Sequence, residues 1–238
     1  MRNMKIWFTV VLALLTIQLS ADEKRYEVKS GIIEYEIQNS GIMMGMETHE
    51  TGSAVTVFKE WGAVELHSQQ SENVTMGQKT LNREMTKVEN GKVFVVDFEQ
   101  KVIYEYTPAM LANAKHNELT KSGKEMLESM GGKKTGQEKF MGYECEVWEM
   151  MHMRLWLHKG IMLKSEGNIM GIRNSITATK IKLDTPVSQS DLKLPDYPIK
   201  KATDPMFPQE GDHENQIPQM TPEQIQQMQE MMKNFSQK

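Results

Sequence analysis

Apolar and polar side chains alternate along the N-terminal half of the chain. Ile33, Tyr35 and Ile37 are separated by glutamates, which is the period of a strand with one buried face. A short apolar run follows at 55–57, and residues 93–106 contain two more runs with a bend between them. Residues 26–106 are therefore predicted to be a succession of strands that ends in a hairpin.

The pattern changes over 108–130, where Ala, Leu, Met, Lys and Glu predominate and a proline stands at the first-turn position. This composition predicts a helix, which the glycine pair at 131–132 ends. The basic segment 133–140 is predicted to be a connection. Alternation returns over 143–183 and predicts roughly four strands, with one turn at 159–160. The order strands, helix, strands predicts an α+β fold, with helix packed on one side of an antiparallel sheet.

The N-terminus has a different character. Arg2 and Lys5 precede an apolar run at 6–19, and small residues follow it. This run is shorter than the ~20 residues needed to cross a bilayer. Residues 1–21 are therefore predicted to be a cleaved signal peptide, which makes the protein periplasmic or secreted. The domain that follows is expected to span 22–184.

The C-terminus is rich in proline and poor in large apolar residues. Residues 185–238 are therefore predicted to form an extended or disordered tail. Near its end, Ile225, Met228 and further apolar residues recur at helical spacing, which predicts a short amphipathic helix over 222–235. Such a short helix is marginal alone. Docking on the domain, docking on an unidentified partner and an unfolded tail are left as three alternatives.

Composition narrows the classes of function. The chain has 28 Lys and Arg against 32 Asp and Glu, a formal net charge of −4, and loss of residues 1–21 would remove two further positive charges. An acidic protein does not offer the concentrated positive surface that nucleic acid requires. The single cysteine, Cys145, cannot form an internal disulfide and is predicted to be a buried thiol in a strand.

Methionine is unusually frequent, with 21 residues in the chain. Thioether and imidazole groups together suit Cu(I), and two clusters, IMMGM and MMHM, are candidates for a copper site. The candidate metal ligands are Met43, Met44, Met46, Met151, His152 and Met153. In a strand, however, Met150 and His152 would share one face and Met151 and Met153 the other. Filling of apolar surfaces is the favoured interpretation, and copper binding is the alternative.

Enzymatic signals are weak. The sequence contains no G-x-S-x-G, H-E-x-x-H or C-x-x-C motif and no phosphate-binding glycine loop. His67 and His158 lie on predicted strands and are expected to face solvent. Asp97 interrupts an apolar strand and is expected to bond to nearby backbone at the strand end. The sequence therefore predicts no catalytic residue and no cofactor.

Four stretches resemble periplasmic proteins of the lipoprotein-carrier-like superfamily (outer-membrane lipoprotein-sorting protein-like), especially an uncharacterised exported branch. They are SGIIEYEI, TVFKEWGAVEL, NGKVFVVDFEQKVIYEYTP and MGYECEVWEMMHMRLWLHKGIMLK, and the likeness covers residues 26–184. The resemblance implies a strongly curved antiparallel sheet, or half-open barrel, with helix packed on or plugging the concave side. In the carriers the cavity takes up acyl chains. No position here matches the carriers' basic acyl-binding position, so no functional residue is transferred.

These observations predict an exported, non-enzymatic binding protein with an apolar cavity for a lipid-like or other hydrophobic ligand. The residues expected to bind the ligand are Trp148, Met150, Trp156 and Met162, because aromatic and flexible thioether groups suit a pocket of variable shape. Peripheral contact with a membrane or a membrane protein is a further expectation. The alternatives are a periplasmic copper-binding protein and an interaction protein that acts through the helix at 222–235.

Overall fold

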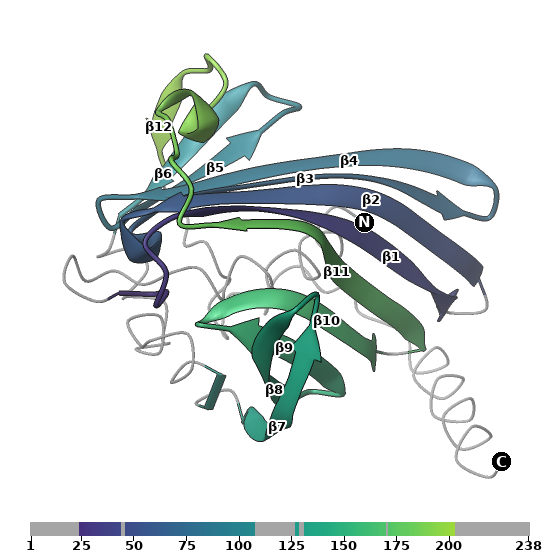
Figure 1. Ribbon diagram of the computed structural model, residues 1–238. Helices are drawn as coiled ribbons and strands as arrows, with labels where there is room; N and C mark the ends of the chain where they lie inside the picture. The colour runs from purple at the N-terminus through teal and green to yellow at the C-terminus, as the bar shows by residue number, and fades with distance from the viewer. Residues whose placement is uncertain (1–23, 44–45, 108–126, 129–130, 170, 203–238) are drawn as a thin grey trace, which may run out of the picture.

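The computed structural model describes residues 24–43, 46–107, 127–128, 131–169 and 171–202. Within these residues, strands form one twelve-stranded sheet (Figure 1). The strands are β1 Gly31–Met43, β2 Met46–Lys59, β3 Val64–Thr75, β4 Gln78–Glu89, β5 Lys92–Asp97, β6 Val102–Tyr106, β7 Lys133–Phe140, β8 Tyr143–Met150, β9 Met153–His158, β10 Ile161–Ile169, β11 Ile172–Leu183 and β12 Ile199–Lys201. Short 3-10 turns are η1, Glu60–Gly62, and η3, Ser190–Leu192.

The sheet is curved and open. Its order is β12-β6-β5-β4-β3-β2-β1-β11-β10-β9-β8-β7, and neighbouring strands are antiparallel except for the parallel pair β12 and β6. The end strands β12 and β7 do not pair with each other, so the sheet does not close. In Figure 1, β1–β4 form a long arch and β7–β10 curl beneath it. The predicted curved, half-open antiparallel sheet is confirmed.

Irregular strand register contributes to the curvature. The register shifts between β1 and β11 after Glu34, between β10 and β9 after Met162, and between β7 and β8. Such bulges bend a strand and increase its twist. The bend brings the Tyr35 hydroxyl of β1 to the Met162 carbonyl oxygen of β10, 2.8 Å away, across the intervening strand β11. Tyr35 therefore points to the concave side of the sheet.

The segment before β1 crosses one end of this concave side. The Tyr26 backbone N–H donates to the Trp61 carbonyl oxygen at 3.0 Å, and the Glu27 N–H donates to the Lys159 carbonyl oxygen at 3.1 Å. The segment is thus hydrogen-bonded both to the β2–β3 connection and to the β9–β10 turn. Gly62 has a φ of 87°, and a Cβ there would lie 2.8 Å from the Tyr26 ring, so this close approach requires glycine.

Residues 185–202 pack on the convex side. Leu192 is completely buried in a cluster with Val57, Val64 and Leu66, and β12 then joins the sheet beside β6. Residues 185–202 are held against the sheet by the buried side chain of Leu192, and the prediction for the rest of the tail, 203–238, lies outside the described residues. The predicted helix near the C-terminus lies outside the described residues.

Most strand predictions are confirmed. The runs at 33–37 and 55–57 lie in β1 and β2, the predicted hairpin is β5–β6, and the four strands expected after residue 143 are β8–β11. No run marked β4, which falls within the general prediction of strands over 26–106. Asp97 ends β5, and its Oδ1 accepts the backbone N–H groups of Glu99 at 2.9 Å and Gln100 at 2.7 Å, as predicted. Cys145 is a buried free thiol in β8, also as predicted.

Other predictions need correction or fall outside the description. Residues 133–140 are not a connection but strand β7, whose exposed position at the sheet edge explains why no apolar alternation marks it. Of the predicted helix at 108–130, only residues 127 and 128 are described, and they are helical. Helix plugging the concave side therefore remains a prediction, and the described chain is nearly all sheet rather than α+β. The predicted signal peptide at 1–21 also lies outside the described residues.

Candidate functional site: the concave face of the sheet

Strand register identifies the side chains that share the concave face with Tyr35. Directly opposite residues in an antiparallel pair point to the same face of a sheet. Following these pairs from β1 through β11, β10 and β9 to β8 traces one continuous row across the sheet. The row consists of Ile37, Ile176, Ser165, Leu155 and Trp148. The inner faces of β8–β11 and of β1 therefore form one concave surface.

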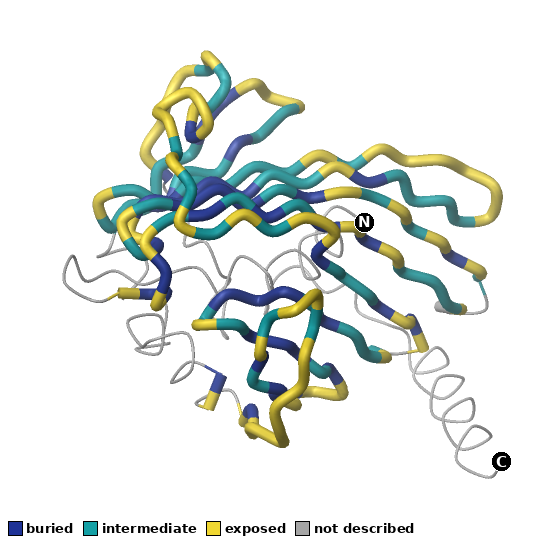
Figure 2. Tube along the Cα trace, in the orientation of Figure 1, coloured by how far each residue is buried: buried dark blue, intermediate teal, exposed yellow. Residues whose placement is uncertain are grey.

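Five apolar residues of β8–β10 form a buried cluster on this surface. We call them the apolar floor: Trp148, Met150, Leu155, Leu157 and Met162. Leu127 is completely buried against them. Figure 2 shows buried positions in dark blue on β8–β10 and towards one end of the long strands. Three of the four predicted ligand residues, Trp148, Met150 and Met162, thus lie together on the concave side.

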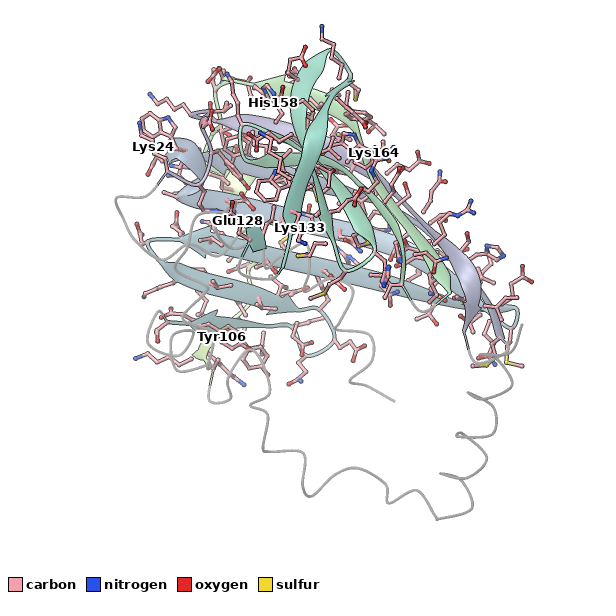
Figure 3. The ribbon with its side chains drawn as sticks, turned by 90° about the horizontal axis from the view of Figure 1, so that it is seen from below. Lys24, Tyr106, Glu128, Lys133, His158 and Lys164 are labelled. Atoms are coloured by element: carbon pink, nitrogen blue, oxygen red, sulfur yellow. The ribbon has the colours of Figure 1, made fainter. Side chains whose placement is uncertain are left out.

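Trp156, the fourth predicted ligand residue, lies on the face of β9 opposite Leu155 and Leu157, and it belongs to a different buried cluster, which also contains Tyr35 and Leu163. Its indole N–H donates to a Glu138 carboxylate oxygen at 2.8 Å. The Arg154 guanidinium and the Lys164 ammonium lie 4.8 and 4.3 Å from the indole ring; Figure 3 labels Lys164 on the curled part of the sheet. This position differs from the prediction, because strand alternation turns Trp156 away from its neighbours Leu155 and Leu157.

The MMHM segment is a turn. Met150 at the end of β8 pairs with Met153 at the start of β9, while Met151 and His152 have positive φ values of 48° and 64°. Met151 is 64% exposed, whereas Met150 and Met153 are buried. The predicted separation of these residues onto two strand faces is wrong, because a two-residue turn places Met150 and Met153 on the same face. The candidate metal ligands Met151, His152 and Met153 therefore do not share one surface.

The second methionine cluster is only partly described. Met46 begins β2 and is half-buried, and the side chains of Met43 and Met44 lie outside the described residues. Across the described part of the chain, no group of three His, Cys, Asp or Glu side chains is placed to hold a metal ion.

Polar side chains occupy the concave face of β2 and β3. Ile33, two residues before Tyr35, is opposite Thr56, which is opposite His67. The buried polar residues of this region are Thr48, Thr56, Glu65, His67 and Ser71. His67 is 7% exposed, so the prediction that it faces solvent is wrong. The sequence of β3, VELHSQQSENVT, is polar at positions of both faces along most of its length, so alternation does not indicate which face is buried.

An ion pair anchors this polar region to the segment before β1. The Arg25 guanidinium donates to the Glu65 Oε2 at 3.1 Å and to the Gly62 carbonyl oxygen at 2.9 Å. The Tyr26 hydroxyl donates to the same Glu65 oxygen at 2.6 Å. Arg25 is 7% exposed and Glu65 is 1% exposed. Because little water reaches either charge, each is stabilised mainly by the opposite charge of the other.

His67 lies next to this ion pair on β3. Its Nδ1 is 3.0 Å from the Thr56 hydroxyl oxygen. Burial lowers the pKa of His67 from 6.5 to about 4, which leaves the imidazole neutral at pH 7. We call Arg25, Tyr26, Thr56, Glu65 and His67 the polar cluster. None of these residues carried a site prediction, because their association depends on contacts between distant segments.

Tyr35 packs in the buried cluster that contains Ile33, Trp156 and Leu163. Its hydroxyl bonds to the Met162 carbonyl oxygen. Burial raises the pKa of Tyr35, the Glu65 charge raises it further, and a hydrogen bond with Thr56 opposes the rise. Tyr35 therefore connects the neighbourhood of Glu65 and Thr56 with the backbone of β10.

A further pair of carboxylates lies farther along the same strands. Glu50 accepts hydrogen bonds from the Ser71 hydroxyl and from the Asn39 amide at 2.8 Å. Burial, with a smaller contribution from the charge of Glu50, raises the pKa of Glu84 from 4.5 to about 7. Ionisation of Glu84 is thus costly in the folded protein.

We expect Glu84→Gln to be more stable than the wild type above pH 7 and close to it near pH 4.5. Because the folded pKa is above the unfolded value, the wild type loses stability as the pH rises from 4.5 to about 7. The expected gain in the free energy of unfolding is about 1–2 kcal/mol. This is less than the pKa shift alone would give, because Glu84 is partly exposed and solvent screens its charge. Urea unfolding of both proteins at several pH values measures it. A difference that is constant across this range would contradict the prediction.

A hollow in the surface lies on the long strands rather than over the apolar floor. It is lined by Thr51, Gly52, Ser53, Gln70, Ser71, Glu72 and Leu81. None of the four predicted ligand residues lines it, and its walls are mostly polar. In the described parts of the chain, no helix combines the length and the hydropathy needed to cross a membrane.

No family model and no curated protein sequence matches this chain. Similar solved structures include an uncharacterized conserved protein from Thermus thermophilus, with 8% identity, a TM-score of 0.40, and coverage of 71% of this chain and 90% of that one. A putative outer membrane lipoprotein-sorting protein domain from Vibrio parahaemolyticus has 10% identity, a TM-score of 0.31, and coverage of 71% and 91%. A LolA superfamily protein from Nitrosomonas europaea has 10% identity, a TM-score of 0.31, and coverage of 73% and 94%. The second and third of these structures are named as a lipoprotein-sorting protein domain and a LolA superfamily protein, the kind of protein that the sequence resembles.

Proposed function

We propose that this protein is an exported, non-enzymatic binding protein whose concave face holds a lipid-like or other hydrophobic ligand. The observation that carries the proposal is the apolar floor, which lies on the inner face of a sheet that does not close. Apolar surface on the inside of an open, curved sheet offers a ligand both burial and a route of entry. Trp148, Met150 and Met162, which the sequence predicted as ligand contacts, belong to this apolar floor.

Ligand entry would involve Leu127. This side chain contacts the apolar floor and is completely buried there. A hydrophobic ligand on Trp148 and Met150 would take the place of Leu127, and its apolar contacts would replace those that Leu127 makes. Binding is therefore expected to be accompanied by a rearrangement around Leu127.

We expect Met150→Ser to weaken binding of the neutral fluorescent probe N-phenylnaphthylamine by about tenfold, since a buried hydroxyl replaces apolar contact surface. Fluorescence titration measures the affinity, and energy transfer from Trp148 reports whether the probe lies near the apolar floor. Met151→Ser is the matched control, because the neighbouring Met151 is an exposed turn residue.

Three results would count against the proposal. The wild type could fail to bind the probe and other neutral apolar molecules. The two serine variants could lose affinity equally. Probe fluorescence could rise without energy transfer from Trp148. The variants must first show wild-type circular dichroism, so that loss of binding is not loss of folding.

A further inference from the structure

Three of the described hairpin turns begin with a methionine. Met76, Met141 and Met151 are the first of the two residues that connect β3 to β4, β7 to β8 and β8 to β9. Their φ values are 53°, 48° and 48°, in the left-handed region where a side chain such as methionine is strained. Turns of this kind favour asparagine, aspartate or glycine at this position. The geometry of the turns therefore does not account for the choice of methionine.

Packing does not account for it either. We call Met76, Met141 and Met151 the turn methionines. Their exposed fractions are 75%, 50% and 64%, whereas Met150 and Met162 of the apolar floor are 5% and 8% exposed. A methionine in a core stabilises the protein by filling apolar space. The turn methionines instead present their thioethers to solvent.

The turn methionines do not share one site. Met141 and Met151 lie beyond opposite ends of β8, which has eight residues. At ~3.3 Å per residue, the strand separates them by about 25 Å. The ligands of one metal ion all lie within a few ångströms of it, so these thioethers do not bind one ion together. The chemistry that fits their arrangement is one that needs a single thioether at a time.

We propose that the turn methionines are oxidation sites, at which the protein consumes hypochlorous acid and related two-electron oxidants without losing its fold. Such oxidants are small and react with one exposed thioether, which becomes a methionine sulfoxide. The sulfur gains one oxygen atom and loses two electrons. The O–Cl bond of the oxidant breaks, and chloride and a proton are released. Each turn methionine therefore removes one molecule of oxidant.

The position of the turn methionines explains why the fold would survive. A sulfoxide is polar and disrupts a core when it forms on a buried methionine. At the tip of a hairpin the new oxygen is hydrated, and no buried contact is lost. The exposed position also admits a methionine sulfoxide reductase, which restores the thioether while two thiols become a disulfide and the oxygen leaves as water. The turn methionines are thus renewable, whereas Met150 and Met162 are shielded.

Oxidation of the full chain tests the assignment. The protein is titrated with hypochlorous acid near neutral pH, and peptide mass spectrometry measures the sulfoxide at each methionine. The turn methionines should react at least about tenfold faster than Met150 and Met162, which react only after local opening. Cys145 should also stay reduced, because its thiol is buried. The urea midpoint of the protein should not change when the turn methionines are oxidised.

A triple variant tests whether the turn methionines protect the fold. Met76→Asn/Met141→Asn/Met151→Asn suits the turns, because asparagine tolerates a positive φ. It should lose half of its native circular dichroism at about three fewer equivalents of hypochlorous acid per chain than the wild type, one for each missing thioether. The matched control removes three exposed apolar side chains that contain no sulfur and should behave as the wild type. This control is Ile42→Thr/Leu81→Thr/Ile199→Thr.

Four results would overturn the proposal. Met150 or Met162 could be oxidised as fast as the turn methionines. The urea midpoint could fall once the turn methionines carry sulfoxides. The asparagine variant could withstand as much hypochlorous acid as the wild type. The threonine control could lose as much resistance as the asparagine variant, which would assign the effect to apolar surface rather than to sulfur.

Discussion

Replacing Arg25 by methionine is expected to destabilise the protein by about 3–5 kcal/mol, the usual cost of leaving one member of a buried ion pair uncompensated. Glu65 would keep the hydrogen bond from Tyr26 but lose its opposing charge, in a place where it is 1% exposed. The hydrogen bond to the Gly62 carbonyl oxygen would also be lost. Urea unfolding at pH 7.5, followed by tryptophan fluorescence, measures the change.

The double variant Arg25→Met/Glu65→Leu provides the decisive comparison. Removing both charges should recover at least half of the lost stability, because the unpaired carboxylate is then absent. Lys180→Ala is the control for an ordinary ion pair. It breaks the Lys180–Glu34 pair, whose side chains are 53% and 43% exposed, and should cost less than about 1 kcal/mol. Equal losses in Arg25→Met and Lys180→Ala would contradict the importance of the buried pair.

His67 is expected to make the protein sensitive to acid. Its pKa is lowered from 6.5 to about 4 in the folded protein, so the unfolded chain binds the proton more readily between these values. Stability from this residue is fully present above pH 6.5 and falls as the pH drops towards 4. The loss in the free energy of unfolding that accompanies protonation of His67 is about 3 kcal/mol.

Comparison with His67→Gln isolates this contribution from other titrating groups. The variant should be less stable than the wild type at pH 7.5, because a fitted imidazole is lost, but the difference should shrink by about 3 kcal/mol on going to pH 4. Gln70→Ala, a change at an exposed and non-titrating position, should give a difference that does not depend on pH. If the stability difference between His67→Gln and the wild type were also independent of pH, the imidazole would not be buried in solution.

The sequence by itself determined most of the strands and their antiparallel arrangement, although not the edge strand β7. Alternation marked β1 clearly, since Ile33, Tyr35 and Ile37 all face the concave side, and local signals placed Asp97 at a strand end. Trp148, Met150 and Met162, which the sequence predicted as ligand contacts, lie in one buried cluster, and their contact with a ligand stays a prediction. These features depend on neighbours close in sequence, where the period of the backbone directly sets the pattern of side chains.

Only the tertiary structure decided which face of the polar strands is buried and what lies on it. In β3 most residues of both faces are polar, so nothing local shows that His67 is buried and Gln70 is exposed. Alternation along β9 separates Trp156 from Leu155 and Leu157, but only the tertiary packing shows which buried cluster each face joins. Arg25 and Glu65 meet although 40 residues separate them. Charge compensation and burial arise from strand pairing and from the return of the N-terminal segment across the sheet, and these are properties of the whole fold.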